Sequence, residues 1–292
     1  MKKSKSTLSE LMTLTFLGTG TSVGVPQIGC TCDVCRSTDY RDRRRRCGAY
    51  VRVGALGILI DTPPEMRLSC CEYGITKVDA VLLTHAHMDH VAGFDDIRRF
   101  NTINGEIVPC DPNCECTRGK THRVIGKVMP VYAMKETEDQ MHNIFPYISD
   151  KGGVNGLYRP QIQFSNDETI VLADEAKEKV EIERIKVEHS FPCCGYKFTS
   201  RGKTLVYISD CHELPQQSLE KIAGVDVLIL NCLRDRPHPT HLNTEKSLKY
   251  SKLINAKRTF ITHMCHDFSH VQWIERLPQG VEPAYDGQVI EL

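Results

Sequence analysis

A short run of the sequence contains four side chains of the types that bind metal ions. The run is His85-Ala86-His87-Met88-Asp89-His90, and it directly follows the apolar segment 80–84. His85 and His87 are two residues apart, so in an extended backbone both side chains point to the same side. Neutral imidazole and carboxylate suit Zn²⁺ and related divalent cations. A histidine-rich surface loop is the alternative, but four such residues after a buried-looking strand favour a metal site.

Three further apolar segments also end at a metal-binding residue type. Segment 184–188 leads into His189, 205–209 into Asp210 and 258–262 into His263. Strand ends can converge on one edge of a sheet, where open sheets generally place their active sites. A pair of cations there would hold a bridging hydroxide near neutral pH and neutralise charge on a phosphoryl oxygen. Phosphodiester hydrolysis by attack of that hydroxide fits the residues, and so does lactone or thioester hydrolysis.

A second metal site is predicted from three cysteines near the start of the chain. Cys30, Cys32 and Cys35 have the spacing of a structural zinc site that needs a fourth ligand. His266 is a good candidate, and Cys265 is its rival. The alternative is three free thiols in a loop.

The stretch 237–242 contains two histidines and two prolines. We predict that His241 donates a proton to a leaving oxygen or holds a phosphate, with His238 as the competing choice and a purely structural histidine as the alternative. Asp89 is the other residue that we expect to act in catalysis. Asp61 follows an apolar segment and either orients a metal ligand or caps the next segment.

Two other motifs receive structural interpretations. We expect Gly18-Thr19-Gly20 to form a tight turn beneath the site, with glycines at unusual backbone dihedrals, rather than a phosphate-binding loop. The basic run 41–46 is interpreted first as a solvated surface, and a phosphate-binding role is the minority alternative.

These residues must be positioned by a mixed set of strands and helices. Short segments rich in Val, Ile and Leu predict strands at 14–17, 49–53, 57–60, 80–83, 128–132, 181–187, 204–208, 225–230 and 258–261. Helices are predicted at 64–73, 95–101, 136–144, 215–222 and 244–254. Strands outnumber helices, which indicates one or two mixed sheets covered by helices in a single domain over 1–292.

Residues 104–123 depart from this pattern and predict a surface insertion. The stretch has little periodicity, and its Cys110, Cys114, Cys116 and His122 either bind another zinc ion or lie in a loop without metal.

Composition narrows the class of protein. The chain has 292 residues, of which 40% are hydrophobic, with 37 basic and 37 acidic side chains, so net charge favours neither nucleic acid nor membrane as a partner. We expect a cytoplasmic protein, because the first residues lack a signal-peptide pattern and no stretch approaches the ~20 apolar residues that span a bilayer. The fourteen cysteines then indicate thiols and metal ligands rather than disulfides.

The His85-x-His87-x-Asp89-His90 motif resembles the signature of the metallo-β-lactamase superfamily, and the resemblance covers nearly the whole chain. It implies an α/β (α+β) fold, the four-layer αββα sandwich, and a dinuclear centre with Zn or Mn ions. The implied ligands of the first metal are His85, His87 and His189, those of the second are Asp89, His90 and His263, and Asp210 bridges the two.

The cysteine motif, the Gly-Thr-Gly turn and the stretch around His241 together resemble the phosphoribosyl cyclic phosphodiesterases of phosphonate metabolism. That resemblance implies a structural zinc on Cys30, Cys32, Cys35 and His266, and hydrolysis of a small cyclic phosphodiester. The tRNA 3′-processing ribonucleases share the site, but no long Gly- and Pro-rich arm is visible. The pyrroloquinoline quinone biosynthesis B proteins carry the same cysteine motif and represent a non-enzymatic alternative. They lack a complete dinuclear site, whereas all seven ligand positions are filled here. We therefore expect a small-molecule partner rather than nucleic acid or membrane, and leave a homodimer open.

Overall fold

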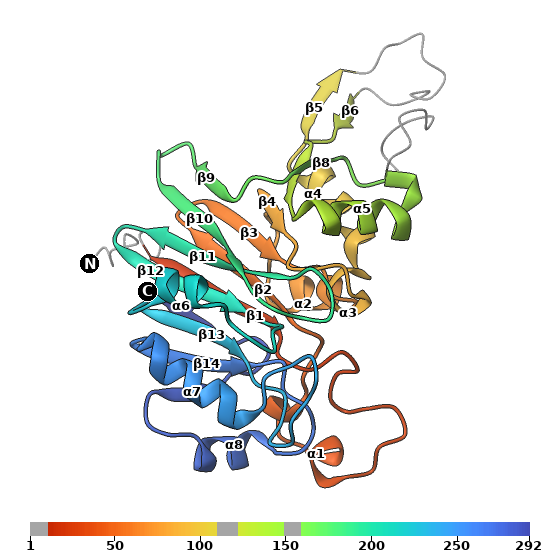
Figure 1. Ribbon diagram of the computed structural model, residues 1–292. Helices are drawn as coiled ribbons and strands as arrows, with labels where there is room; N and C mark the ends of the chain where they lie inside the picture. The colour runs from red at the N-terminus through yellow and green to blue at the C-terminus, as the bar shows by residue number, and fades with distance from the viewer. Residues whose placement is uncertain (1–10, 110–121, 149–158) are drawn as a thin grey trace, which may run out of the picture.

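Two β-sheets packed face to face form the centre of the molecule (Figure 1). The computed structural model describes residues 11–109, 122–148 and 159–292, and the statements below concern those residues. The first sheet has the order β16 (Val289–Glu291), β1 (Met12–Gly18), β2 (Gly48–Val53), β3 (Leu56–Ile60), β4 (Ala80–Leu82), β7 (Met129–Tyr132) and β8 (Ile162–Ser165). The second has the order β15 (Val281–Pro283), β14 (Arg258–Thr262), β13 (Val227–Asn231), β12 (Lys203–Ile208), β11 (Cys194–Ser200), β10 (Lys179–Lys186) and β9 (Thr169–Ala173).

Helices lie outside the two sheets. They are α1 (Asp33–Arg36), α2 (Met66–Glu72), α3 (Met88–Val91), α4 (Arg98–Ile103), α5 (Lys135–Ile144), α6 (Gln216–Ile222), α7 (Thr244–Ile254) and α8 (His270–Arg276), with 3-10 turns η1 (Tyr40–Asp42), η2 (Phe94–Ile97) and η4 (Pro146–Ile148). The helices α2, α4 and α5 pack on the first sheet, whereas α6 and α7 pack on the second. This is the predicted αββα arrangement, which is confirmed.

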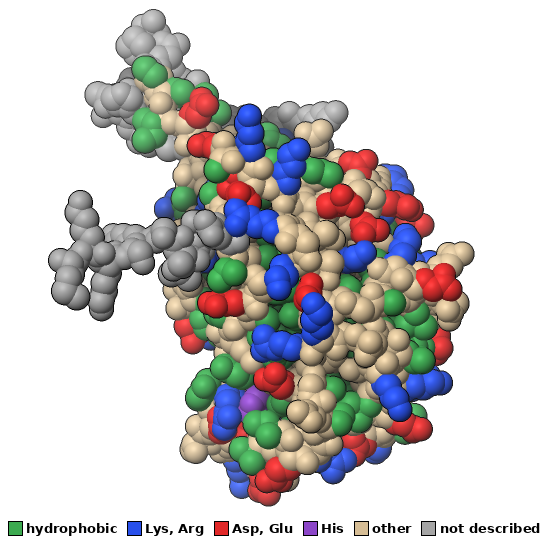
Figure 2. Space-filling view, turned by 90° about the vertical axis from the view of Figure 1, so that its left-hand side faces the viewer, with side chains coloured by type: hydrophobic (Ala, Val, Ile, Leu, Met, Phe, Trp, Pro, Cys, Tyr) green, Lys and Arg blue, Asp and Glu red, His purple; other side chains and the backbone are tan. Residues whose placement is uncertain are grey.

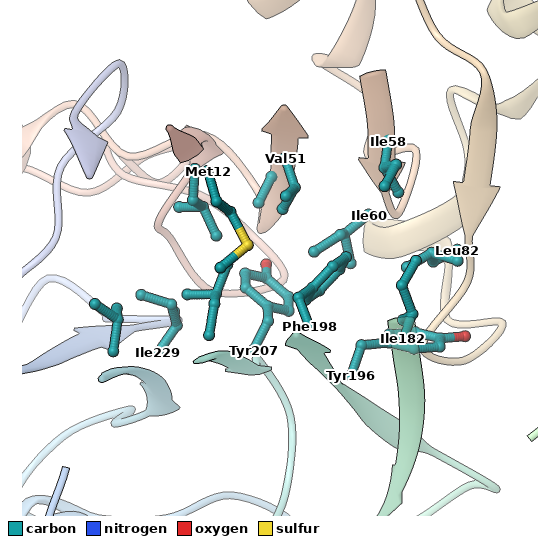
Figure 3. Packing of buried hydrophobic residues seen from close by; sticks show 14 of the residues in the cluster. Met12, Val51, Ile58, Ile60, Leu82, Ile182, Tyr196, Phe198, Tyr207 and Ile229 are labelled. Carbon is teal, nitrogen blue, oxygen red and sulfur yellow. The ribbon is translucent and has the colours of Figure 1, made fainter. Parts of the chain in front are cut away.

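The main core lies between the sheets, because strands of both sheets turn alternate apolar side chains inward. Met12, Val51 and Ile58 of the first sheet face Phe198 and Tyr207 of the second (Figure 3). All are at most 4% exposed, and burying one such side chain fully stabilises the fold by about 1.5–3 kcal/mol. Two further apolar clusters lie beneath the outer helices, so the two central sheets are held as a rigid unit.

Strand direction brings the predicted site residues to one end of the molecule. Strands β3, β4, β7 and β8 are parallel in the first sheet, and β12, β13, β14 and β15 are parallel in the second. Two antiparallel pairings then place β10 in the same direction as β12. The carboxyl ends of β4, β10, β12 and β14 can therefore lie together.

The predicted insertion projects from the sheets as a two-stranded antiparallel ribbon, β5 (Glu106–Pro109) and β6 (His122–Ile125) (Figure 1). Cys110, Cys114 and Cys116 lie outside the described residues, as does the side chain of His122, so another zinc site there stays a prediction. Among the described helices, none has both the length and the apolar character that a membrane span requires.

Candidate metal centre

Four strand ends supply a compact group of histidines and carboxylates. The ligand-type atoms of His85, His87 and His189 lie within 4.8 Å of one another, and the same holds for Asp89, His90 and His263. Asp210 lies between these triads: its Oδ2 is 3.1 Å from His90 Nε2, and its Oδ1 is 3.2 Å from His263 Nε2. The structure thus brings together all seven residues that the sequence motif and strand ends singled out.

Local backbone structure explains this convergence. His85 ends the segment after β4, and α3 begins at Met88, so Asp89 and His90 lie on the first turn of a helix rather than in an irregular turn. His263 follows β14 with a φ of 62°, a left-handed conformation that is costly for a residue with a side chain. The turn aims the His263 ring back at Asp210 instead of continuing along the strand.

Burial and charge set the protonation of these groups. Burial lowers the pKa of His85 well below its ordinary value and also lowers the pKa values of His87 and His189, so these rings are neutral at pH 7. Burial also opposes protonation of His90, but the carboxylates around it outweigh burial and raise its pKa. Burial disfavours ionisation of Asp210, yet His263 and His90 outweigh it and lower the pKa of this carboxyl well below its usual range.

The cluster has the character of a cation site. His90 Nε2, His189 Nε2, Asp210 Oδ2 and both ring nitrogens of His263 are buried and have no hydrogen-bond partner among the described residues. Buried polar atoms normally have partners, and the contacts of 3.1 and 3.2 Å from Asp210 to His90 Nε2 and His263 Nε2 lack hydrogen-bond geometry, which indicates that a bound group satisfies these atoms. Imidazole nitrogens and carboxylate oxygens are ligands that Zn²⁺ and Mn²⁺ accept, and the residues therefore fit a pair of divalent cations.

Neighbouring residues hold the rings in place. Asp61 Oδ2 lies 2.8 Å from His90 Nδ1 and also accepts a bond from the hydroxyl of Thr84. His189 Nδ1 lies 2.8 Å from the carbonyl oxygen of Thr240, which accepts from it. Such contacts fix ring orientation and tautomer. Of the two roles predicted for Asp61, orientation of a histidine is the one that its contacts favour, whereas Thr240 had no signal in the sequence.

His241 lies against the cluster, whereas His238 is further away. The His241 ring stacks on His263 with centroids 4.6 Å apart, and its Nδ1 is 3.5 Å from Asp210 Oδ1. Burial, followed by His263, lowers the pKa of His241 to about 3, so its ring is neutral at pH 7. The Nδ1 atom of His238 instead contacts the neighbouring Thr240. Geometry therefore favours His241 as the ring that reaches a substrate.

The three cysteines of the predicted zinc site surround one histidine. His266 Nδ1 is 3.3 Å from the sulfurs of Cys30 and Cys35 and 3.5 Å from that of Cys32. Tetrahedral zinc with ordinary Zn–S and Zn–N bonds would place a sulfur and a nitrogen roughly 3.5 Å apart, so the group fits the ion without rearrangement. Cys265 points elsewhere and accepts a bond from the backbone N–H of Asp267, so His266 is the better placed of the two candidates.

Two predictions about the surrounding loops are wrong. Gly18 and Gly20 do not have positive φ; a Cβ on Gly18 would lie 2.0 Å from the carbonyl oxygen of Arg46, so close backbone approach is what requires glycine. The basic run is not simply solvated, because Arg44 is buried and donates to the carbonyl oxygens of Cys265 and Phe268. Those carbonyls need a buried donor. Cys265 lies in the turn that joins His263 to His266, and Phe268 follows that turn directly.

A two-sheet fold with clustered His and Asp side chains at its strand ends defines a class of protein. A model of the β-lactamase superfamily domain matches residues 57–264, which is more than half of the chain. The chain therefore belongs to the metallo-β-lactamase superfamily of hydrolases. A solved structure described as a new diphosphatase from the PhnP family is 32% identical, with a TM-score of 0.79 and 97% of each chain covered.

Two curated relatives match over longer proteins. An octanoyltransferase of Porphyromonas gingivalis is 31% identical over 277 residues, which cover 93% of this chain and 50% of that protein. A ribonuclease Z of Clostridium tetani is 25% identical over 198 residues, which cover 66% of this chain and 52% of that protein. The chain thus spans about half the length of each of these relatives.

Proposed function

We propose that this protein is a metal-dependent phosphodiesterase that acts on a small phosphodiester, such as a cyclic one. The observation that carries the proposal is the pair of His and Asp triads with Asp210 placed against both, in which several buried nitrogen and oxygen atoms have no hydrogen-bond partner among the described residues. The similarity to a structure named as a diphosphatase supports chemistry at phosphorus rather than at a lactone or thioester.

Each residue of the cluster has a role in this proposal. His85, His87 and His189 would hold one cation, Asp89, His90 and His263 the other, and Asp210 would contact both. When bound, such a pair of divalent cations lowers the pKa of water and neutralises charge on a phosphoryl oxygen. Asp61 and the Thr240 carbonyl keep His90 and His189 oriented, while His241 would contact the phosphoryl or leaving oxygen. Cys30, Cys32, Cys35 and His266 would hold a structural zinc ion.

The test compares three substrates with the purified protein loaded with zinc or manganese. We expect hydrolysis of bis-(p-nitrophenyl) phosphate and of a ribose cyclic phosphate, and no comparable hydrolysis of a lactone. His87→Ala should abolish diester hydrolysis, because it removes one of three ligands of a proposed metal, while the circular dichroism spectrum stays that of the wild type. Near-normal turnover by His87→Ala, or a preference for the lactone, would contradict the proposal.

A ribonuclease role is the second candidate, because ribonuclease Z proteins are among the relatives. Binding of an RNA needs a broad basic surface, and here basic and acidic side chains are equal in number. The face drawn in Figure 2, which is not the face that carries α3, also mixes Lys and Arg with Asp and Glu. We therefore expect weak cleavage of a tRNA precursor with a shallow salt dependence, because few phosphates would be neutralised. Efficient cleavage at physiological salt would favour this candidate instead.

A further inference from the structure

A cavity of 770 Å³ lies beside the metal centre and is not used by the chemistry proposed above. It begins at His189 and follows the loop between β10 and β11, with α6 on one side and the start of α5 on another. Small-molecule sites commonly enclose about 300–1,000 Å³, so the cavity has room for a group much larger than a phosphate. Its position makes it the natural place for the part of a substrate that is not hydrolysed.

Phe191 is the residue that joins this cavity to the centre. Its side chain is 47% exposed, although it is a large aromatic residue, and it lines the cavity. Its ring also lies 4.6 Å from the ring of His87, centroid to centroid, in an edge-to-face arrangement. A substrate phosphate held by the histidine cluster would therefore carry its next group directly past the open side of this ring.

The charges around the cavity restrict what kind of group fits. Arg184 and Lys135 line it, but the first donates to the backbone carbonyl oxygens of Ala133 and Asp167, and the second pairs with Asp139 at 2.8 Å. Lys186 lies 3.9 Å from Glu188, which also lines the cavity. Lys221 also lines the cavity, as do Glu136 and Glu168. Because positive and negative side chains are mixed in the lining, it favours a neutral polar ring system over a polyphosphate or an RNA backbone.

We propose that this cavity binds a nucleoside, or a similar flat ring-bearing alcohol, esterified to the phosphate that is hydrolysed, and that the base stacks on Phe191. This inference rests on the proposed phosphodiesterase function and adds a substrate class to it. Phe191 is then a specificity-determining residue: it contacts the unreacted part of the substrate and does not take part in bond cleavage. A base has flat faces for the ring, and ribose hydroxyls suit the polar lining.

The test uses two diesters with the same leaving group. Thymidine 5′-(p-nitrophenyl phosphate) carries a nucleoside, whereas methyl p-nitrophenyl phosphate carries only a methyl group in its place. Phe191→Ala should lower kcat/KM for the nucleoside diester about tenfold, mainly through KM, because a stacked base loses its partner. It should leave kcat/KM for the methyl diester within about twofold. Phe191→Trp should restore the preference. Tyr40→Ala is the matched control, because Tyr40 is an exposed aromatic that lines a different cavity.

The outcomes separate this inference from the function on which it rests. An equal loss on both diesters would mean that Phe191 acts only through His87, and the inference would be overturned. A wild-type enzyme with no preference for the nucleoside diester would overturn it while leaving the phosphodiesterase assignment intact. If neither diester is hydrolysed, the assignment fails, and calorimetric binding of thymidine 5′-monophosphate decides about the cavity: equal affinity in the wild type and Phe191→Ala would overturn the inference.

Discussion

Two residues at strand ends have a left-handed backbone conformation that directs their side chains toward the metal centre. Asp61 and His263 both have φ near +60°, and both lie directly after strands that lead to the metal centre. Such backbone conformations cost of order 1–3 kcal/mol for residues with side chains, so the surrounding contacts must determine them. For Asp61 those contacts are the backbone N–H and hydroxyl of Thr84 and the ring of His90. The Asp61 carboxylate binds Nδ1 of His90 and so leaves Nε2 to face the cluster.

Replacing Asp61 should therefore weaken a metal site without removing a ligand. We expect Asp61→Asn to reduce affinity for the second divalent cation by about 10–100-fold, since loss of an orienting carboxylate has effects of this size. Competition with a chromophoric chelator measures the affinity. Asp79→Asn is the matched control, because Asp79 also accepts from a backbone N–H at a neighbouring strand but lies away from the cluster. Equal affinities in Asp61→Asn and the wild type would contradict the assigned role.

At the scale of elements, buried side chains join loops that lie far apart in the sequence. Arg44 and Asp42 hold the turn between β14 and α8, where Asp42 also accepts from the N–H of His270 at the start of α8. Asp286 likewise joins two loops near the end of β1. Its Oδ1 accepts from the Thr19 hydroxyl at 2.8 Å, and its Oδ2 accepts from the backbone N–H of Arg45 at 2.7 Å. The loop beneath the metal centre is thus attached to the segment between β15 and β16.

Asp286 gives the stability a pH dependence whose sign can be stated. Burial raises the pKa of its carboxyl to about 7, whereas the unfolded chain has an ordinary value of about 3.9. Between these values the folded protein holds a proton that the unfolded chain has lost, so this contribution to stability is full below pH 4 and disappears as pH rises through 7. Asp286→Asn cannot titrate. We expect the urea-unfolding free energy of the wild type, relative to Asp286→Asn, to fall from pH 5 to pH 8; parallel curves would refute this.

Sequence patterns predicted the elements that are long, apolar and periodic, and they missed elements that lack these properties. The predicted strands at 49–53, 204–208 and 258–261 match β2, β12 and β14 within one residue at each end. The strand β11 was missed because its sequence, CGYKFTS, contains no run of Val, Ile or Leu. Its signal is alternation: Cys194, Tyr196 and Phe198 face the core between the sheets, and Lys197 and Thr199 lie between and after them. The helix α8 was missed although Ser269 and Gln272 form a capping box, a signal that could have found it.

Site residues were predictable by type but not by partner. Histidines and aspartates at four strand ends can be read from the chain, because strand direction alone brings them to one edge. The contacts of Asp61, Thr240 and Phe191 join segments 29 to more than 100 residues apart, and no spacing rule expresses them. The same is true of Arg44, whose burial depends on carbonyl groups more than 220 residues away.

For the whole molecule, the two proposed metal sites share one turn, since His263 and His266 are three residues apart. The turn is nevertheless held by several contacts that do not involve Cys30, Cys32 or Cys35. The backbone N–H of Met264 donates to the Thr19 carbonyl, that of Cys265 donates to the Leu233 carbonyl, and Arg44 binds the Cys265 carbonyl. His263 should therefore keep its place when the cysteine site is lost.

Cys32→Ser tests this separation of the two sites. It should remove one zinc ion per chain and lower Tm by about 5–10 °C, since a few kcal/mol shift a chain of this size by roughly that much. The two other metals and the rate of diester hydrolysis should change much less. Metal analysis by mass spectrometry and a thermal melt measure both effects, with Cys71→Ser, an exposed thiol on α2, as the control. An unchanged Tm would count against the structural zinc. Loss of all metals together would show that the backbone contacts of the His263 turn depend on the structural zinc.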